Sequence, residues 1–557
     1  MTRALSPRGA LALQNVDGAL SFALRAALAM ALPSLPMALA GRADEAVYAM
    51  LGSFTTTFGR NQPYGRRARV LALAAVAMTA CVGCGSGLGA WVRPQDGGAG
   101  AVVVVMTTAL VAGVAKFACD ATRLSGLGAV LLLFSFAVAA NGSPAPSDVL
   151  PYTGLAAVGA AVAWTLGVSG RLIHPDRPQR IAVAAALREV ADLMESGGGT
   201  GPHRHQATAA VLQAYRTLGL MPPTAAGRGA RSDTVVRLTD FSWSLLVRAA
   251  PPPDAAALAV RLRVQVRLLV GRRRGRSDLA PELPLPPLAP PGAVAPRAPE
   301  ERAAEERAAE LVTGPSHGAR GHGPVLLVPA LRMVLGTGLA GGTALFLGVG
   351  HSYWAAISAA AVLHSVNVRT AAQRAVQRTL GTIVGLVLGF GLLALDPAPM
   401  VLVLLIVSLE FLLEYGVARN YALGVVFVTP LALLLSDLAT PGAADALVGD
   451  RAVSSALGIV AGLLCALVVV HARAALRAQR ALAACTAACE AAEQALTDGI
   501  RSSYPFAQTH LAAAAVELRE ADDAAAGELW PAEIDPTELA AAEQRAYRLL
   551  ERLAQGD

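Results

Sequence analysis

Two acidic residues lie inside a strongly apolar segment of this chain. Glu410 and Glu414 are four residues apart in the run 400–415, so a helix places both carboxylates on one face. Glu410 is ten residues into the run, about 15 Å along a helix and close to the middle of a bilayer. A carboxyl group there could take up and release a proton, as a proton-coupled carrier requires. The structural alternative is that both residues pair with Arg419 or with arginines of another helix.

Several basic and polar residues nearby could bind an anion or relay a proton. Arg419, Asn420 and Tyr421 follow the acidic segment at a tight turn, where Arg419 could hold a substrate carboxylate or only anchor the loop. His364 could relay protons at physiological pH or hydrogen-bond two helices. Arg332 lies early in a long apolar segment, where it either extends to the membrane surface or forms an anion site inside the bundle.

An aromatic pair and an arginine pair complete the candidate binding residues. Tyr353 and Trp354 begin an apolar segment, a position typical of anchoring at the membrane surface; stacking on an aromatic substrate is the alternative. Arg374 and Arg378 precede the next apolar segment and could attract an anionic substrate.

The composition indicates a membrane protein. Of the 557 residues, 54% are hydrophobic and only 15% are charged, whereas soluble domains carry about 25% charged residues. The apolar residues concentrate in twelve segments, most of them near the length that crosses a bilayer as a helix. We predict spans at 20–40, 46–58, 70–92, 99–119, 124–140, 150–168, 325–348, 353–368, 379–395, 400–415, 421–435 and 453–471.

These segments predict an all-α protein with four parts. Residues 1–170 form a first transmembrane block of six spans, and 325–471 form a second. Residues 171–324 and 472–557 are predicted to be cytoplasmic helical regions, with a proline-rich linker at 281–299.

The positions of the arginines predict the topology. Arg66 and Arg67 follow the second segment, and Arg473 and Arg477 follow the last, whereas the alternate loops are nearly free of basic residues. The exception is Arg451, which we assign to the loop before the last span. The positive-inside rule then places both termini in the cytoplasm. Six spans in each block imply parallel repeats in the same orientation.

The polar regions show helical periodicity. We predict helices at 181–194, 207–218, 233–247, 255–269, 300–311 and 538–553. The basic stretch 261–276 is either a solvated helix end or a contact for anionic lipid. It lacks the interleaved aromatic residues of nucleic-acid-binding segments, so we expect no nucleic acid partner.

We expect no metal, cofactor or enzymatic activity. Cys81 and Cys84 lie within an apolar segment, where packing is the favoured interpretation. His203 and His205, like the pair at 317 and 322, lack cysteine or carboxylate partners at ligand spacing. No nucleophile and base are recognisable as a pair.

Two motifs resemble a known family. The run His351-Ser-Tyr-Trp-Ala-Ala-Ile357 and the run Arg374-Ala-Val-Gln-Arg-Thr-Leu-Gly-Thr-Ile-Val-Gly385 are similar to the fusaric acid resistance protein-like family, which includes the aromatic acid exporters and resembles the plant malate channels. The resemblance implies six spans, a cytoplasmic helical region, six more spans and a cytoplasmic tail. It also implies export of aromatic or other organic acids with the proton gradient. The first block departs from the motif, with Tyr48 in place of the tryptophan.

The functional hypothesis is an inner-membrane exporter of small organic anions, in particular aromatic carboxylic acids. Its partners are the lipid bilayer, the anion and a second copy of the chain in a homo-oligomer. A passive anion channel and a non-transporting membrane scaffold are the alternatives.

Overall fold

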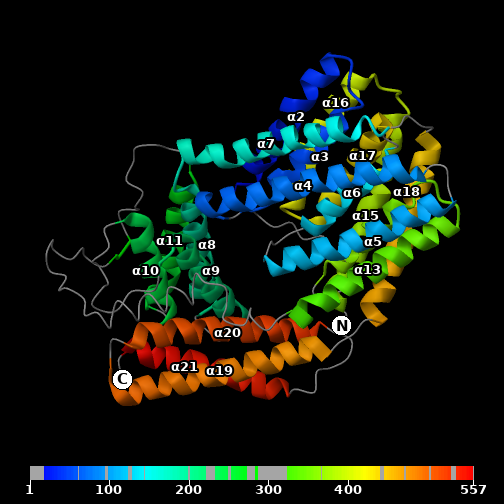
Figure 1. The fold of residues 1–557 in the computed structure, drawn as a ribbon. Coiled ribbons are helices and arrows are strands. Elements are labelled where there is room, and N and C mark those ends of the chain that lie inside the picture. The colour runs from blue at the N-terminus through cyan, green and yellow to red at the C-terminus, as the bar shows by residue number, and fades with distance from the viewer. Residues whose placement is uncertain are drawn as a thin grey trace. The chain divides into compact units, whose positions relative to one another are not determined.

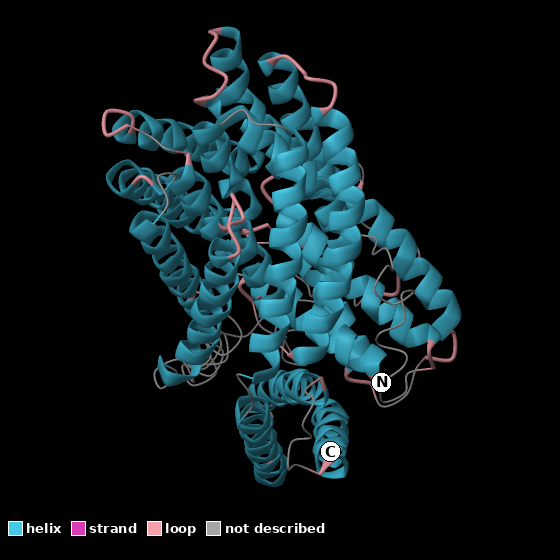
Figure 2. Cartoon of the chain, turned by 90° about the vertical axis from the view of Figure 1, so that its right-hand side faces the viewer, coloured by secondary structure: helices cyan, strands magenta, loops and turns pink. Residues whose placement is uncertain are grey.

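The computed structural model consists of helices, and the residues it describes include no strand (Figure 2). It describes residues 18–555 apart from 61, 95–97, 123–127, 143–144, 198–200, 221–232, 249–251, 272–282, 286–322, 366, 440–443, 469–471, 501–502 and 528–534. The predicted all-α fold is therefore confirmed. Most of the proline-rich linker, the helix predicted at 300–311, the end of the basic stretch and the histidines at 317 and 322 lie outside the described residues.

The chain divides into two compact units, each assembled from two separate stretches of sequence. Residues 1–173 and 323–470 form one unit, called here the apolar unit, and residues 174–322 and 471–557 form the other, the polar unit. The two apolar stretches thus pack against each other, and so do the two polar stretches.

The apolar unit contains a helical segment at each of the twelve predicted spans (Figure 1). In chain order these are α2 (Ala19–Leu39), α3 (Ala46–Ser53) with the 3₁₀ turn η1 (Phe54–Thr57), α4 (Tyr64–Val92), α5 (Gly98–Ala121), α6 (Gly128–Asn141), α7 (Val149–Ile173), α13 (Gly323–Phe346), α14 (Tyr353–Leu363), α15 (Val368–Leu393), α16 (Pro399–Val417), α17 (Tyr421–Ala439) and α18 (Ala444–Val468). Among the described residues, nine of these helices are long and apolar enough to cross a membrane.

Helices α3, α6 and α14 are the short ones, and two of them have only buried side chains. Every residue of α3 and of α14 is buried. The span predicted at 353–368 is wrong in length, because α14 ends at Leu363 and Asn367 starts a new helix. The Asn367 side chain accepts a hydrogen bond from the Thr370 amide at 2.8 Å and Thr370 Oγ1 accepts one from the Asn367 amide at 3.2 Å, a capping box that fixes the start of α15.

Equivalent helices of the two apolar stretches make equivalent contacts. Helix α2 packs on α16 as α13 packs on α5, and the α5–α13 pair runs side by side in Figure 1. Helix α3 packs on α7 as α14 packs on α18, and α4 contacts α6 and α7 as α15 contacts α17 and α18.

Two glycines show how closely these pairs match. A Cβ on Gly159 of α7 would lie 1.9 Å from the carbonyl oxygen of Ala49 in α3. A Cβ on Gly458 of α18 would lie 2.3 Å from the carbonyl oxygen of Ala355 in α14. Only glycine permits this approach of two backbones, so both pairs use the same small-residue packing.

The surface of the apolar unit carries leucines that a bilayer would cover. Along α2, exposed leucines recur every fourth residue at 20, 24, 28 and 32, and along α13 they recur at 327, 331, 335 and 339. Each is at least 44% exposed. A stripe of this kind on a soluble protein would be a large apolar patch, whereas lipid accommodates it without cost.

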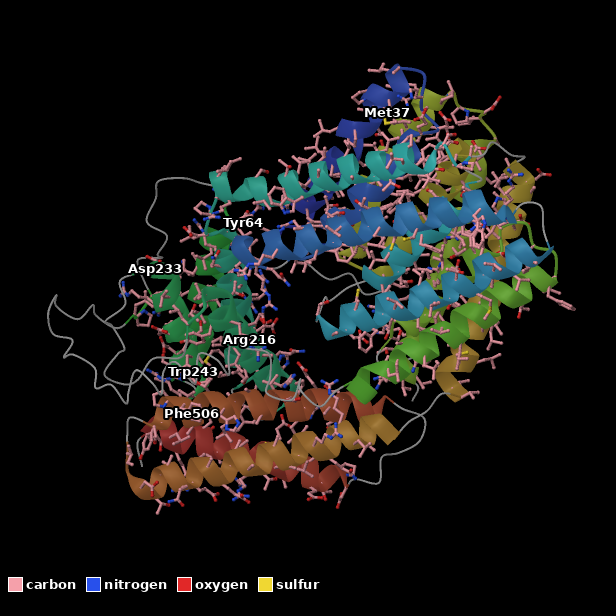
Figure 3. All side chains as sticks on the ribbon, viewed as in Figure 1. Met37, Tyr64, Arg216, Asp233, Trp243 and Phe506 are labelled. Atoms are coloured by element: carbon pink, nitrogen blue, oxygen red, sulfur yellow. The ribbon has the colours of Figure 1, made fainter. Side chains whose placement is uncertain are left out.

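The polar unit is built from helices with one buried face. They are α8 (Arg177–Glu195), α9 (Pro202–Leu218), α10 (Thr234–Leu246), α11 (Ala255–Val270), α19 (Ala472–Asp498), α20 (Tyr504–Ala526) and α21 (Pro536–Gln555). One hydrophobic core joins them, and α9 packs on α20. Helix α10 begins at Asp233, whose side chain accepts a hydrogen bond from the Val235 amide at 2.8 Å, and carries Trp243 further along (Figure 3).

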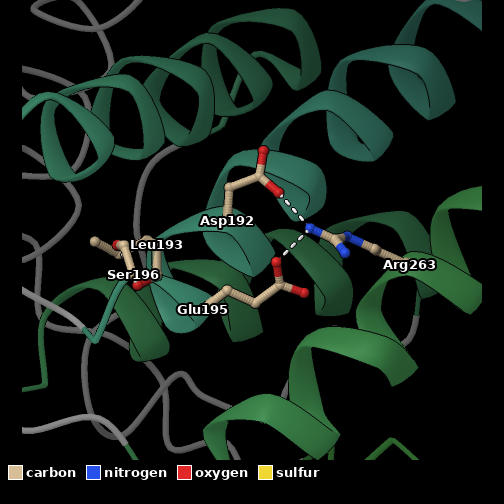
Figure 4. A network of polar contacts seen from close by, with 5 residues as sticks. All are labelled: Asp192, Leu193, Glu195, Ser196 and Arg263. Atoms are coloured by element: carbon tan, nitrogen blue, oxygen red, sulfur yellow. Dashed lines mark hydrogen bonds and ion pairs between the residues drawn. The ribbon is translucent and has the colours of Figure 1, made fainter.

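One charged network of the polar unit lies at its surface. Arg263 of α11 donates hydrogen bonds to Asp192 and Glu195 of α8, each at 2.8 Å (Figure 4). All three side chains are more than a third exposed, so this network contributes little stability. The solvated helix end favoured for part of the basic stretch is consistent with this placement of Arg263.

Candidate functional site

The acidic pair lies on the buried face of α16, the helix that packs on α2. Glu410 is 1% exposed and Glu414 is 3% exposed. Glu414 Oε2 accepts a hydrogen bond from Arg60 Nη2. Glu410 Oε2, in contrast, is buried without a hydrogen-bond partner. The two carboxyl groups therefore have different surroundings although they are one helical turn apart.

Arg60 comes from the other apolar stretch of the chain. It follows η1, and its guanidinium carbon lies 3.7 Å from the ring centroid of Phe22 in α2. Arg25 approaches the same ring at 5.5 Å. Of the two partners that the structural alternative allowed, Glu414 pairs with an arginine from elsewhere in the chain and not with Arg419, which lies 4.2 Å from the ring of Tyr415. The partner of Glu414 is an arginine more than 350 residues away in sequence, which no local pattern could indicate.

A second group of polar residues surrounds the short helix α14. Arg378 Nη2 donates a hydrogen bond to Ser358 Oγ at 2.9 Å, and Arg378 Nη1 donates to the Tyr421 hydroxyl at 3.4 Å. Arg374 lies 5.6 Å from the Tyr421 ring. Arg378 Nε is buried without a partner. Three of the predicted binding residues thus meet beside α14.

Arg451 joins this group and was assigned to a loop from the sequence. The structure corrects that assignment, because α18 begins at Ala444 and carries Arg451 on its buried face, where the residue is 3% exposed. Its guanidinium carbon lies 3.7 Å from the ring centroid of Trp354. Arg451 Nε and Nη1 are buried without hydrogen-bond partners.

A signal for Arg451 was present in the sequence. Arg451 falls in helical register with Leu447, Gly458 and Gly462, all on the buried face of α18. A search for apolar residues alone starts the span at Val453 and excludes Arg451. For the same reason the span predicted at 379–395 begins too late. Helix α15 starts at Val368, and its first turns carry Arg374 and Arg378.

The aromatic pair is enclosed by protein rather than exposed at a surface. Tyr353 is 7% and Trp354 is 2% exposed, so the expectation of membrane-surface anchoring is wrong for these rings. Trp354 packs against Tyr353 at 4.9 Å and against Phe134 of α6 at 5.7 Å between ring centroids. The Tyr353 hydroxyl lies 3.4 Å from Ser436 Oγ. Both apolar stretches contribute rings to this cluster.

A small cavity adjoins the aromatic cluster. It has a volume of about 50 Å³ and is lined by residues of α5, α13 and α14, among them Thr108, Tyr353 and Ala356. Sites for small organic ligands usually measure about 300–1,000 Å³. This cavity can hold water but no aromatic acid.

The remaining predicted residues lie at the ends or sides of their helices. His364 is the C-terminal cap of α14 and is partly buried. Arg332 is partly buried in α13. Asn420 Oδ1 accepts a hydrogen bond from the Ala422 amide at 2.7 Å and so starts α17. Within the described residues, no three histidine, cysteine or acidic side chains are grouped as a metal site would require.

Comparisons with known proteins match the part of the chain that holds most of these residues. Residues 339–465 match the model of a family described as fusaric acid resistance protein-like. The uncharacterized membrane protein YvaC of Bacillus subtilis (strain 168) is 36% identical to this chain over 126 residues. That match covers 22% of this chain and 20% of the relative, so the chain spans only about a fifth of the protein it matches. No solved structure matches the chain.

Proposed function

We propose that this chain, whose residues 339–465 belong to the fusaric acid resistance protein-like family, exports small organic anions and in particular aromatic carboxylic acids. It is a multi-pass membrane protein with nine helices, among the described residues, that are long and apolar enough to span a bilayer. The proposed location is the inner membrane with both termini in the cytoplasm. The two apolar stretches are proposed to be parallel repeats.

The observation that carries the proposal is the pair of buried arginines around α14. Arg378 and Arg451 are 5% and 3% exposed and have guanidinium nitrogens without partners. A buried cation with unused donors costs free energy, about 1–3 kcal/mol for each unsatisfied group and more when it is charged. Fixed positive charge inside a membrane protein attracts anions and excludes cations.

Glu410 supports coupling of this transport to protons. Its carboxyl group is buried on a membrane helix with one oxygen unpartnered, whereas Glu414 is neutralised by Arg60. An uncompensated charge at that place is expensive, so binding and release of a proton by Glu410 would change the stability of the surrounding packing. Of the two acidic residues, Glu410 is therefore the proposed proton carrier and Glu414 the structural one.

The test is efflux of radiolabelled benzoate from proteoliposomes that contain the full chain. We expect efflux from the wild type to accelerate when the outside is made acidic. Glu410→Gln is expected to retain downhill efflux. The increase in its efflux rate on acidification should be at least about tenfold smaller than in the wild type, because a neutral amide cannot carry the proton. Arg369→Gln, which removes an exposed charge at the start of α15, is the control and should behave as the wild type.

The outcomes separate the competing functions. Voltage-dependent benzoate current that persists without a pH gradient in both variants would favour the passive channel. Absence of benzoate flux, in a preparation whose folding is verified, would contradict the proposed function and favour the scaffold. Unchanged acceleration in Glu410→Gln would overturn the coupling role alone.

A further inference from the structure

We propose that Arg451 is the carboxylate-binding residue, held by Trp354 and aided by Arg378. The inference rests on the proposed transport of organic anions and names the side chain that would receive the carboxylate. Arg451 lies outside the two motifs that resemble the family, on the buried face of α18.

The first step in the argument is the geometry of Arg451. The ring of Trp354 covers one face of the guanidinium at 3.7 Å and leaves the plane of the guanidinium for hydrogen bonding. Two of the nitrogens, Nε and Nη1, have no partner. A carboxylate approaching in that plane would satisfy buried donors that the protein itself leaves unused.

The second step concerns the neighbouring carboxylate. Asp450 precedes Arg451 and would be an obvious counter-ion, but its Oδ2 lies 2.8 Å from His351 Nδ1. Among the charged groups that act on Arg451, Arg378 has the largest effect and repels it. Arg378 is fixed by Ser358 on the same helix that carries Trp354. A monovalent anion at Arg451 would relieve the repulsion between the two cations.

The third step is that the fold does not need an arginine at this position. Tyr152 precedes Gly159 by seven residues, as Arg451 precedes Gly458, and these glycines make the matching contacts with Ala49 and Ala355. The residues before those alanines are Tyr48 and Trp354.

Tyr48 and Tyr152 stack with ring centroids 3.8 Å apart, in the place where the other pair has Trp354 and Arg451. The same backbone packing is therefore satisfied by a neutral aromatic pair. Because two neutral tyrosines give the same backbone packing, this packing does not require the charge of Arg451, which is available for a ligand. The neutral first pair offers no cation at the position that corresponds to Arg451.

The chemistry of the ligand follows from the side chains that surround Arg451. A guanidinium with free donors binds a carboxylate through two parallel hydrogen bonds, which a spherical chloride cannot accept in the same way. The cluster of Trp354, Tyr353 and Phe134 adds aromatic surface. Aromatic surface favours benzoate over acetate and chloride. The cavity beside Tyr353, at about 50 Å³, is smaller than sites for small organic ligands usually are.

The experiment is equilibrium binding of radiolabelled benzoate to the purified full chain in lipid nanodiscs, with unlabelled acetate, cyclohexanecarboxylate and chloride as competitors. We expect saturable binding to the wild type and competition strongest for cyclohexanecarboxylate, then acetate, then chloride. Arg451→Gln should weaken binding at least about tenfold, and Arg369→Gln, an exposed arginine, should leave it unchanged. Equal weakening by Arg369→Gln would mean a non-specific charge effect and would overturn the site.

A second variant controls for misfolding. Trp354→Tyr combined with Arg451→Tyr rebuilds the Tyr48–Tyr152 pair in the other half of the unit, and should fold and bind no benzoate. Failure of this variant to fold would overturn the argument, since Arg451 would then be structural. Wild-type affinity in Arg451→Gln, or competition by chloride as strong as by cyclohexanecarboxylate, would also overturn it.

The two proposals can fail separately. Benzoate binding that depends on Arg451 without any transport would remove the export function and keep the site. Proton-driven benzoate efflux that is unchanged in Arg451→Gln would keep the export function and remove the site.

Discussion

The α3–α7 pair and the α14–α18 pair have the same backbone packing, but the first is neutral and the second carries a positive charge. In the first, Tyr48 stacks on Tyr152, and in the second Trp354 covers Arg451. In both pairs, a glycine of the longer helix lies directly against a carbonyl oxygen of the shorter one. The comparison shows that this backbone packing does not depend on the charge. The first pair packs with two neutral rings, and the second pair places a charged arginine at the same position.

Helices α5 and α16 show the same contrast. Each carries two ionisable residues at a spacing of four residues, on helices that make equivalent contacts with α13 and α2. In α5, Lys116 and Asp120 form their own ion pair at 2.7 Å. In α16, both residues are acidic, and Glu414 depends on Arg60 from elsewhere in the chain. In α5 the two charges neutralise each other within one helix, whereas in α16 Glu414 needs a partner from another part of the chain.

Of the variants that test the contrast between α5 and α16, Arg60→Gln is expected to reduce stability most. Removal of the arginine leaves the Glu414 carboxylate buried without its partner, and we expect a loss of about 3 kcal/mol in the free energy of unfolding. Denaturant titration of the protein in detergent measures it. Adding Glu414→Gln to the same chain should restore most of the stability, because no charge remains to be compensated. A double variant no more stable than Arg60→Gln would show that Arg60 acts through Phe22 and not through Glu414.

A smaller effect, similar in both halves, is expected from alanine at the two contact glycines. Gly159→Ala and Gly458→Ala each place a methyl group against a backbone carbonyl oxygen, so the helix pairs must separate, at a cost of about 1–3 kcal/mol each. Thermal unfolding of the two variants in the same lipid provides the measurement. If one variant were as stable as the wild type, the two helix pairs would not share their packing and the comparison would fail.

The smallest effect is expected at the ion pair of α5. Lys116→Gln should reduce stability by about 0.5 kcal/mol, because this pair lies within one helix and Asp120 is 25% exposed. Measured beside Arg60→Gln, the result compares a local pair with one that joins distant segments. A loss as large as that from Arg60→Gln would show that the α5 pair is not the self-sufficient one.

The sequence predicts where the helices lie far better than where they end. All twelve apolar segments appear as helices, because an apolar run needs no tertiary information to be recognised. The ends are set by features such as the Asn367 cap, and by arginines that continue a helix beyond the apolar run, as in α15 and α18. Helix α14 is short because a buried helix surrounded by protein need not match the thickness of the bilayer.

The sequence indicates which residues are candidates for the site, but it indicates only some of the contacts that they make. Buried acidic residues and arginine clusters stand out in apolar sequence, so Glu410, Glu414 and Arg378 were found. The contact of Glu414 with Arg60, and that of Arg451 with Trp354, join segments distant in sequence and depend on how the helices pack. The sequence contains no local pattern for either contact.

The central claim is that the second apolar stretch carries the anion chemistry on a frame that the first stretch shares. The most direct measurement is proton-driven benzoate efflux from proteoliposomes for two matched double variants, Tyr48→Phe with Tyr152→Phe and Trp354→Tyr with Arg451→Tyr. We predict efflux at the wild-type rate for the first variant and a loss of at least about tenfold for the second, with both folded. Equal rates in the two variants, or a loss confined to the first, would contradict the account.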